Sequence, residues 1–273
     1  MDSITQTNRL VLWINKEPSQ VALACKIINK FDVIGIVFES RPHKRKISFK
    51  KIIEKIIEKL TLKELDIAWQ DMQYDYENQF PSIPNDIPYL EVENINQQEV
   101  IQFTKNLKAD LIIVSGTSLI KKHMFQLELS KGMMNLHTGL SPYIKGGPNC
   151  TNWCFAINKP ELIGNTVMWL DEGIDSGKII STEKTVFNHK PTFSELHQIV
   201  MEHAHQLYIR SIGSIVENKK IPGIDQNDIG IGITYYTKNW TLNQKRKALN
   251  NFKKWQPTIV DPKLTIKTIP LPN

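Results

Sequence analysis

The sequence predicts an α/β fold in which helices cover both faces of an open, mostly parallel sheet. Apolar runs of strand length recur at residues 10–14, 32–38 and 110–114. Uninterrupted runs of this kind are typical of strands that are buried on both faces. Helix-like stretches separate them, and strands that alternate with helices form parallel sheets. A change in composition near residue 218 adds a small C-terminal extension to this prediction.

The first forty residues have the pattern of a strand, a helix and a second strand. We expect strands over 10–14 and 32–38, a turn over 15–19 and a helix over 20–30. This is a Rossmann-like opening, but no Gly-x-Gly-x-x-Gly follows the first strand. The fingerprint of a dinucleotide site is therefore absent.

The next segment is expected to supply the rest of the parallel sheet. Isoleucines at helical spacing, with Glu and Lys between them, predict an amphipathic helix with one face on a core. The expected elements are a helix over 47–65, a short strand over 65–69, an irregular surface segment over 70–88, a strand over 88–92 and a helix over 94–108.

The second half begins with an apolar run that ends at Leu136 and reads as the end of a buried strand. A strand over 166–170 and an alternating stretch over 178–186 are expected to pair as a hairpin. Thr192 and Glu195 form a capping box, which opens a long helix to about Val216.

Three histidines lie on that long helix, His197, His203 and His205. No pair has the i, i+4 spacing of a helical metal site, so solvated histidines are the preferred interpretation.

Charge and cysteine content narrow the functional classes. The net charge of +6 suits an anionic substrate such as a nucleotide, but it does not require nucleic acid. Much of the excess lies in residues 41–46, which we interpret as a solvated loop. Cys25, Cys150 and Cys154 form no CxxC pair, so reduced thiols are expected. No signal peptide or membrane-spanning run is visible, and we expect a cytoplasmic protein that binds no membrane.

The most informative stretch runs from residue 133 to residue 177. Asn135 and His137 are two residues apart at the end of the expected strand, so their side chains point to the same face. The following loop, 138–148, holds two prolines and three glycines, which fix turns and allow close approach to a ligand. Residues 171–177 form a second tight loop that carries carboxylates.

Two motifs in this stretch carry a resemblance. The pattern Asn-x-His-x-x-Leu-x-Pro, followed by Asp-x-Gly-x-Asp-x-Gly, resembles the folate-dependent formyltransferase family. That family includes glycinamide ribonucleotide, methionyl-tRNA and nucleotide-sugar formyltransferases. The resemblance implies a catalytic set of Asn135, His137 and Asp175. It also implies 10-formyltetrahydrofolate as co-substrate, with no metal.

Formyl transfer to an amine has three chemical needs, and these residue types meet them. An imidazole titrates near ~6.5 in water, so His137 suits a general base. The side-chain NH₂ of Asn135 suits a donor to the oxyanion. Asp175 would orient the imidazole and favour its charged form. Either His137 or Asp175 alone would more simply be a structural loop residue; together, in the order of the family, they favour catalysis.

The resemblance also implies binding residues. The expected folate-binding residues are Gly116, Thr117, Ser118, Leu119, Ile120, Leu170, Asp171 and Gly173. The first five form a turn after a strand, and a plain strand-to-helix turn is the alternative. Asp171 is itself expected to form a turn, with its backbone near the folate. The expected acceptor-binding residues are Ser141, Pro142, Tyr143, Lys145, Gly147, Tyr235 and Tyr236. The two last tyrosines fit a core position and a base-stacking position equally well.

Departures from the family pattern guide the choice of acceptor. Thr138 and Gly139 replace the Pro-Ser or Ala-Ser pair of the purine and tRNA members, and this resembles the sugar-modifying branch. The Gly-Ser-rich phosphate turn of the purine members is missing. The residues after 218 are also too few for the β-barrel of tRNA members.

We therefore expect formylation of a nucleotide-diphosphate amino-dideoxy sugar for a surface polysaccharide such as lipopolysaccharide O-antigen. The alternatives are a glycinamide ribonucleotide or methionyl-tRNA formyltransferase, and a non-catalytic binding relative. We expect residues 1–217 to form the catalytic domain and 218–273 an extension packed on it. A homodimer is expected by resemblance only.

Overall fold

The computed structural model describes residues 8–41, 49–84, 86–147, 149–217, 221–257 and 266–272. Residues 42–46 of the basic stretch, Pro148 of the Gly- and Pro-rich loop and the first residues of the expected extension lie outside these ranges.

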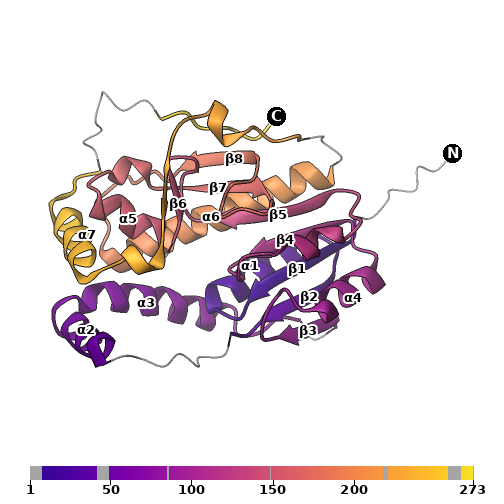
Figure 1. Cartoon of the computed structure of the whole chain (residues 1–273), viewed down its shortest axis with the longest axis horizontal. Coiled ribbons are helices and arrows are strands. Elements are labelled where there is room, and N and C mark those ends of the chain that lie inside the picture. Colours follow the sequence, from indigo (N-terminus) through magenta and orange to yellow (C-terminus); the bar gives the residue numbers. More distant parts are fainter. Residues whose placement is uncertain are drawn as a thin grey trace.

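A seven-stranded sheet forms the centre of the molecule, in the order β3-β2-β1-β4-β5-β7-β8 (Figure 1). Its strands are β1 (Leu10–Asn15), β2 (Val33–Glu39), β3 (Tyr89–Val92), β4 (Leu111–Ser115), β5 (Gly132–His137), β7 (Gly164–Trp169) and β8 (Ile179–Lys184). The first five strands of this order are parallel, and β5–β7 and β7–β8 are antiparallel pairs. The predicted open, mostly parallel sheet and its hairpin are confirmed. Strands β6 (Ile144–Gly146) and β9 (Ile233–Tyr235) form a small parallel sheet of their own.

Helices α1 (Pro18–Ile28) and α6 (Phe193–Val216) pack on one face of the large sheet, and α4 (Gln98–Leu107) packs on the other. The described residues also form α2 (Phe49–Thr61), α3 (Lys63–Gln79), α5 (Cys150–Ala156) and α7 (Leu242–Lys254). Leu12 and Ile14 of β1 join a core cluster with α1 and α6. The alternate residues Val11 and Trp13 join a second cluster with α4. Burial of both faces explains why β1 is apolar throughout.

Residues 65–79 differ from the prediction of a short strand and an irregular segment, because they belong to α3. Its buried residues Leu65, Ala68, Met72 and Tyr76 follow one another at intervals of three or four, which is the spacing of one helix face. The polar residues between them are mostly exposed, and the first proline comes only at position 81. The expected helix over 47–65 therefore divides into α2 and the start of α3. Its predicted apolar face is not fully covered, because Ile53, Ile56 and Leu60 of α2 are exposed.

The histidines of α6 also differ from the prediction. His197 and His205 are buried rather than solvated. Burial lowers the pKa of His197 to about 4, and burial together with nearby Lys26 lowers that of His205 to about 3, so both rings are neutral. His203 is half-buried and contacts Glu183. No cluster of three or more His, Cys, Asp or Glu suited to a metal ion occurs within the described ranges. Nor does any helix in those ranges have the length and apolar character to cross a membrane.

The C-terminal residues pack on the rest of the chain. Leu249 and Phe252 of α7 share a core cluster with Phe155 of α5 and Phe193 of α6. Strand β9 pairs with β6, which belongs to the loop after β5. The cartoon shows α7 beside α5 and above the α2–α3 pair (Figure 1). The division into two units at residue 218 remains a prediction.

Tyr208 of α6 connects this helix to the two strands at the centre of the sheet. Its buried hydroxyl accepts from the Val114 amide at 3.1 Å and reaches the carbonyls of Val114 at 2.9 Å and Met134 at 2.8 Å. Burial raises the pKa of Tyr208 well above its usual range, so the hydroxyl keeps its proton. Tyr208 therefore fixes β4 and β5 close to the points where both strands end.

Replacing Tyr208 by Phe keeps the ring and removes this hydroxyl. The buried Val114 amide loses its acceptor and the two buried carbonyls lose the single O–H donor they share, and we expect a loss of about 1–3 kcal/mol in the free energy of unfolding. Urea denaturation measures this quantity. Tyr74→Phe, at an exposed position of α3, is the control and should leave it unchanged. Equal stability of both variants would contradict a role for the Tyr208 hydroxyl.

Candidate active site

A cavity of about 720 Å³ lies at the carboxyl ends of the parallel strands. Its walls include Asn15 at the end of β1, Arg41 after β2 and Ser115 at the end of β4. This is the edge where ligands bind in open α/β sheets. The volume is in the ordinary range for small-molecule sites, which is about 300–1,000 Å³.

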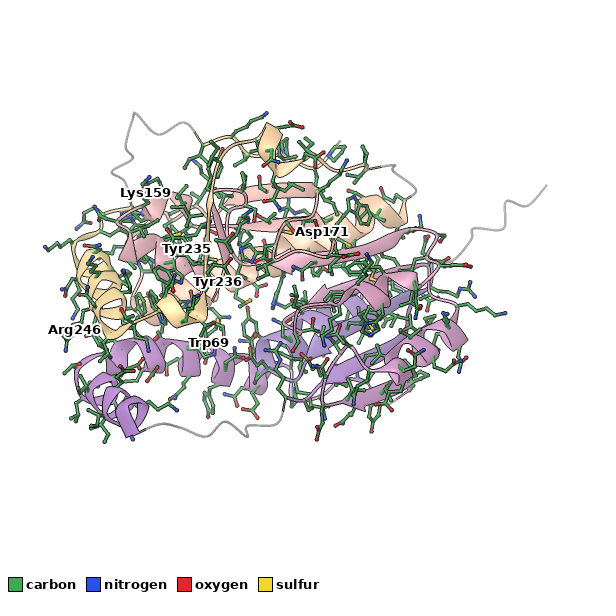
Figure 2. All side chains as sticks on the ribbon, in the orientation of Figure 1. Trp69, Lys159, Asp171, Tyr235, Tyr236 and Arg246 are labelled. Carbon is green, nitrogen blue, oxygen red and sulfur yellow. The ribbon has the colours of Figure 1, made fainter. Side chains whose placement is uncertain are left out.

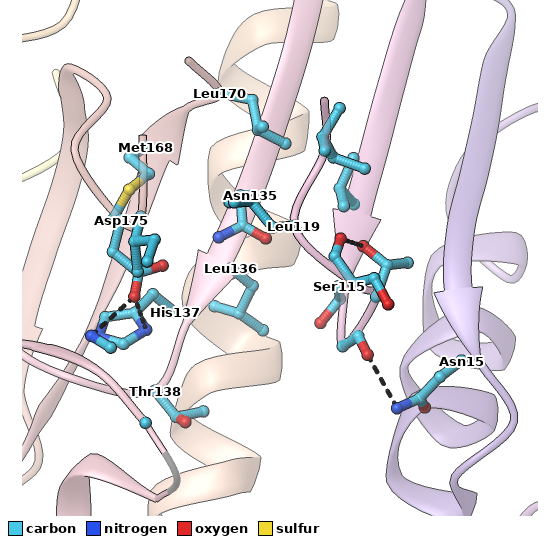
Figure 3. Close-up of a pocket in the computed structure, with 18 of the residues that line it drawn as sticks. Asn15, Ser115, Leu119, Asn135, Leu136, His137, Thr138, Met168, Leu170 and Asp175 are labelled. Carbon is cyan, nitrogen blue, oxygen red and sulfur yellow. Dashed lines mark hydrogen bonds and ion pairs between the residues drawn. The ribbon is translucent and has the colours of Figure 1, made fainter. Parts of the chain in front are cut away.

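The predicted triad lies together in this cavity. Asn135 and His137 project from β5, and Asp175 comes from the loop after β7 (Figure 3). A carboxylate oxygen of Asp175 is 3.4 Å from Nδ1 of His137 and accepts from the Gly146 amide at 2.9 Å. The close-up shows the Asn135 amide beside this pair (Figure 3). The structure thus brings the three side chains together, and their chemical roles stay predictions.

The imidazole of His137 is held in a narrow site. Only 8% of the residue is exposed. The second ring nitrogen, Nε2, lies 3.4 Å from the Ile144 carbonyl and 3.6 Å from the Cys150 sulfur. A Cβ at Gly139 would lie 2.4 Å from Nε2 and 3.0 Å from the Cys150 sulfur. A glycine at this departure from the family pattern is therefore a steric requirement of the packing around His137.

The expected folate-binding residues all line the cavity. They are Gly116, Thr117, Ser118, Leu119, Ile120, Leu170, Asp171 and Gly173. Asp171 shapes its own loop, because its side chain accepts from the Gly173 amide at 3.0 Å and the Ser176 hydroxyl at 2.7 Å. This agrees with its interpretation as a turn-forming residue.

Glu39 holds the turn after β4 from behind. This buried carboxylate at the end of β2 accepts from the amides of Ser118 at 2.6 Å and Ile95 at 3.0 Å, and from Nε of Arg41 at 2.9 Å. Burial alone would raise the pKa of Glu39, but these hydrogen bonds outweigh it and hold the pKa below its usual value. Arg41 and Asn15 also donate to the Gly116 carbonyl, each at 3.0 Å. The turn is therefore fixed by Glu39 from outside the cavity and by Arg41 and Asn15 on the cavity wall.

The expected acceptor-binding residues divide into two groups. Gly147, Tyr235 and Tyr236 line the cavity. The other four, Ser141, Pro142, Tyr143 and Lys145, are not among its lining residues.

Packing explains where two of these four lie. Ser141 is fully buried, with its amide bonded to Thr166. The Tyr143 hydroxyl bonds the backbone of Lys267. Ser141 and Tyr143 therefore do not line the cavity, although they are close to the motif in the sequence.

The two tyrosines of the C-terminal segment have different surroundings. The ring of Tyr235 stacks on Trp153, with centroids 4.3 Å apart, which matches the core interpretation. Tyr236 is 46% exposed and lines the cavity together with Trp69 of α3. The stick view shows these two residues next to one another, on elements far apart in the sequence (Figure 2). Because the ring of Tyr236 is exposed in the cavity, a base-stacking role remains the prediction for this residue.

Comparisons with known proteins give the family. The model of a family described as formyl transferase matches residues 22–212, more than half of the chain. The chain belongs to the formyl transferase family.

Individual relatives agree at this level. The chain is 34% identical to a methionyl-tRNA formyltransferase of Alkaliphilus oremlandii over 148 residues, which are 54% of this chain and 46% of the relative. The chain spans about half the length of the curated relatives it matches.

Solved structures show the same fold. A 4-N formyltransferase from Francisella tularensis matches with a TM-score of 0.55 and 19% identity, over 89% of this chain and 87% of that one. An N-formyltransferase from Helicobacter canadensis, in complex with folinic acid and dTDP-3-aminofucose, matches with a TM-score of 0.52 and 15% identity, over 93% and 84%.

Sequence reasoning missed several cavity residues of this family member. Asn15 and Arg41 follow strands that were predicted, so the rule that ligands bind at the carboxyl ends of parallel strands would have found them. Trp69 was missed because its helix was read as a strand. Gln20 is buried, lines the cavity and has a side-chain oxygen without a hydrogen-bond partner in the part of the chain that is described. A lone glutamine in a helix gives no sequence signal.

Glu39→Gln should destabilise the protein by about 1–3 kcal/mol at pH 7, because an amide cannot accept all three charge-assisted hydrogen bonds. The folded-state pKa of Glu39 is lowered. Its stabilising effect is therefore complete above the ordinary carboxyl pKa of about 4.3 and is lost as the pH falls through the lower folded-state value.

Urea unfolding of the wild-type protein and of Glu39→Gln between pH 7 and pH ~4 checks this. The difference between their free energies of unfolding should be constant near pH 7 and should become smaller toward pH ~4. Glu77→Gln, at an exposed position of α3, is the control. A difference that widens on acidification would contradict the assignment.

Proposed function

We propose that this protein transfers a formyl group from 10-formyltetrahydrofolate to the amine of a nucleotide-linked amino-dideoxy sugar. The observation that carries the reaction type is the meeting of Asn135, His137 and Asp175 in one cavity. Membership of the formyl transferase family supports it.

The triad supplies the three functions that the reaction needs. When bound, the co-substrate supplies a formyl carbon that is already activated on nitrogen. His137 would take a proton from the attacking amine and return one to the departing nitrogen, so the ring ends as it began. The Asn135 NH₂ would donate to the formyl oxygen as negative charge develops there. Asp175, 3.4 Å from Nδ1 of His137, would orient the ring and stabilise it while it carries the proton.

The walls of the cavity fit a flat, aromatic co-substrate. Leu119 is 52% exposed and Ile174 is 43% exposed, and both line the cavity. They come from the two loops on either side of β5, one after β4 and one after β7. Exposed apolar side chains on two neighbouring loops are suited to contact a pterin ring between them. Gly116, with φ of +70°, lets the first loop turn sharply at the end of β4.

Free amides at the amino end of a helix can bind a phosphate. The amino end of α1 is not suited to bind a phosphate of the acceptor in this way. Pro18 has no N–H. The Ser19 amide donates to the Gln73 side chain at 2.9 Å, and the Gln20 amide donates to the Glu17 carbonyl at 2.8 Å. Glu17 also places a carboxylate on this wall of the cavity. This favours an acceptor other than glycinamide ribonucleotide.

Aromatic residues favour a nucleotide in the same cavity. Tyr236 has an exposed ring, and Trp69 lines the cavity from α3. Rings of this kind stack on nucleotide bases, and one such contact contributes about 1–3 kcal/mol. The Helicobacter canadensis N-formyltransferase in complex with folinic acid and dTDP-3-aminofucose, which has a similar fold, is consistent with this class of acceptor.

Methionyl-tRNA is the second candidate acceptor, because the curated relatives with 30–34% identity are named for it. The basic residues of α7, Lys245, Arg246, Lys247, Lys253 and Lys254, are compatible with a nucleic-acid backbone. Two of these lysines already form ion pairs within the protein, Lys245 with Glu58 and Lys253 with Glu64.

A panel of acceptors tests the proposal. The protein is incubated with 10-formyltetrahydrofolate and, separately, with amino-dideoxy sugars on dTDP or UDP, with glycinamide ribonucleotide and with methionyl-tRNA. We expect a formylated nucleotide sugar by mass spectrometry, and tetrahydrofolate released in equal amount. Formylation of methionyl-tRNA alone would support the second candidate. Folate binding without turnover of any amine would contradict catalysis.

His137→Ala and Asp175→Ala test the roles of the triad. Loss of a general base typically costs about 10²–10⁴ in kcat, and we expect each variant to lose activity in that range. Dissociation constants for the folate, from fluorescence titration, should stay close to the wild-type value. His123→Ala, at an exposed histidine, is the control. Near-wild-type rates for either triad variant would refute its role.

A further inference from the structure

We propose that Gln226, in the C-terminal segment, is a positioning residue that holds Asp175 against His137. This inference rests on the proposed function, because it takes Asp175 as the residue that orients the base. Gln226 lies in the short 3₁₀ turn Gln226–Asp228, beyond residues 22–212 that the family model matches. The inference gives this C-terminal segment a part in positioning the proposed catalytic residues.

The side chain of Gln226 bonds the backbone of the Asp175 loop at two points. Its NH₂ group donates to the carbonyl of Asp175 at 2.7 Å and to the carbonyl of Gly177 at 2.9 Å. The residue is only 7% exposed, so both contacts are shielded from water. One amide group has two N–H donors, and here the loop takes both. Gln226 therefore fixes the backbone of the loop at Asp175 and at Gly177, two residues further along the chain.

Asp175 needs such support because of its backbone conformation. Its φ is +47°, in the left-handed region that residues other than glycine seldom adopt. Such a residue persists only where its surroundings hold it. In this conformation its carboxylate reaches both the Gly146 amide and the His137 ring. Loss of the two carbonyl contacts would let the loop relax and carry the carboxylate away from the ring.

The same C-terminal segment also fixes the second partner of the carboxylate. Strand β9 pairs with β6, with Tyr235 opposite Gly146, and the Gly147 amide donates to the Tyr235 carbonyl at 3.0 Å. A Cβ at Gly146 would lie 2.1 Å from that carbonyl. The segment thus reaches the Asp175 carboxylate from two sides, through Gln226 and through Gly146.

Gln226→Met tests the inference, because methionine has a similar length and no N–H donor. A displacement of about 1 Å in a catalytic group can cost roughly 10²-fold in rate, and we expect kcat to fall by about 10- to 100-fold. The folate dissociation constant and the KM of the acceptor should change by less than about threefold, since neither ligand contacts Gln226 in this scheme. In an Asp175→Asn background, Gln226→Met should cause little further loss, because the two residues act as one unit.

Asp225→Asn is the matched control. It changes the neighbouring residue and removes an exposed ion pair with Lys178 at 3.3 Å. The hydrogen bonds from Gln226 to the two loop carbonyls are unchanged. We expect wild-type kcat. Hydrogen exchange of the amides at 172–177 adds a readout that needs no acceptor, and it should become faster in Gln226→Met and not in Asp225→Asn.

Two results would overturn the inference while leaving the proposed function intact. One is wild-type kcat in Gln226→Met alongside a loss in Asp175→Asn. The other is a further loss in the double variant equal to that of Gln226→Met alone. Unchanged exchange at 172–177 would overturn it whether or not an acceptor is formylated. Failure of the proposed function has a different signature, in which the wild-type protein formylates no amine and Asp175→Asn has no effect.

Discussion

The active-site geometry depends on a loop that must run back along the strand carrying His137. Strand β7 is antiparallel to β5, with Trp169 opposite Met134 and Thr166 opposite His137. The chain therefore leaves β7 three residues away from His137, or about 10 Å along an extended strand. Residues 170–177 must cover that distance and deliver a carboxylate to the ring. The contact of 3.4 Å between Asp175 and His137 is the result.

The need for residues 170–177 to turn back along β5 explains the side-chain contacts and the glycines of this loop. Asp171 closes a turn through its own side chain, which bonds Gly173 and Ser176. At the far end, a Cβ on Gly177 would lie 1.7 Å from the Trp169 carbonyl, so only glycine allows the loop to close at its base. Asp175 then adopts its left-handed conformation between these two fixed points. The motif Asp-x-Gly-x-Asp-x-Gly therefore describes the requirements of a tight loop as well as the position of the proposed catalytic carboxylate.

The elements that the sequence predicts well are those with local signals. Strand β5 and the Asn135–His137 pair follow from an apolar run and a spacing of two, and the start of α6 follows from a capping box. Helix α3 was misread because a break at Leu62 interrupts the apolar period. The burial of His197 and His205 depends on how α6 packs, which the sequence of α6 alone does not contain.

Contacts between distant segments were the least predictable. The Gln226 side chain meets residues 49 and 51 positions earlier in the chain, and a single glutamine in a Gly- and Asp-containing stretch has no periodic pattern. Glu39 is similar, since its amide partners lie 56 and 79 residues away. The three residues of the predicted triad lie together because they sit on predicted strand ends and turns. Ser141 and Tyr143 lie away from the cavity, because a neighbouring position in the sequence says little about which side of a loop faces a cavity.

Glu39 and Gln226 perform matching tasks on the two loops that flank β5. Glu39 accepts from an amide of the loop after β4, and Gln226 donates to carbonyls of the loop after β7. Each side chain is buried and engages loop backbone from outside the cavity, so neither loop can shift without breaking a shielded hydrogen bond. The chemical centre is therefore rigid on both sides. In the proposed function, differences between acceptors would then be accommodated by the remaining walls, which carry the half-buried Trp69 of α3 and the exposed Tyr236.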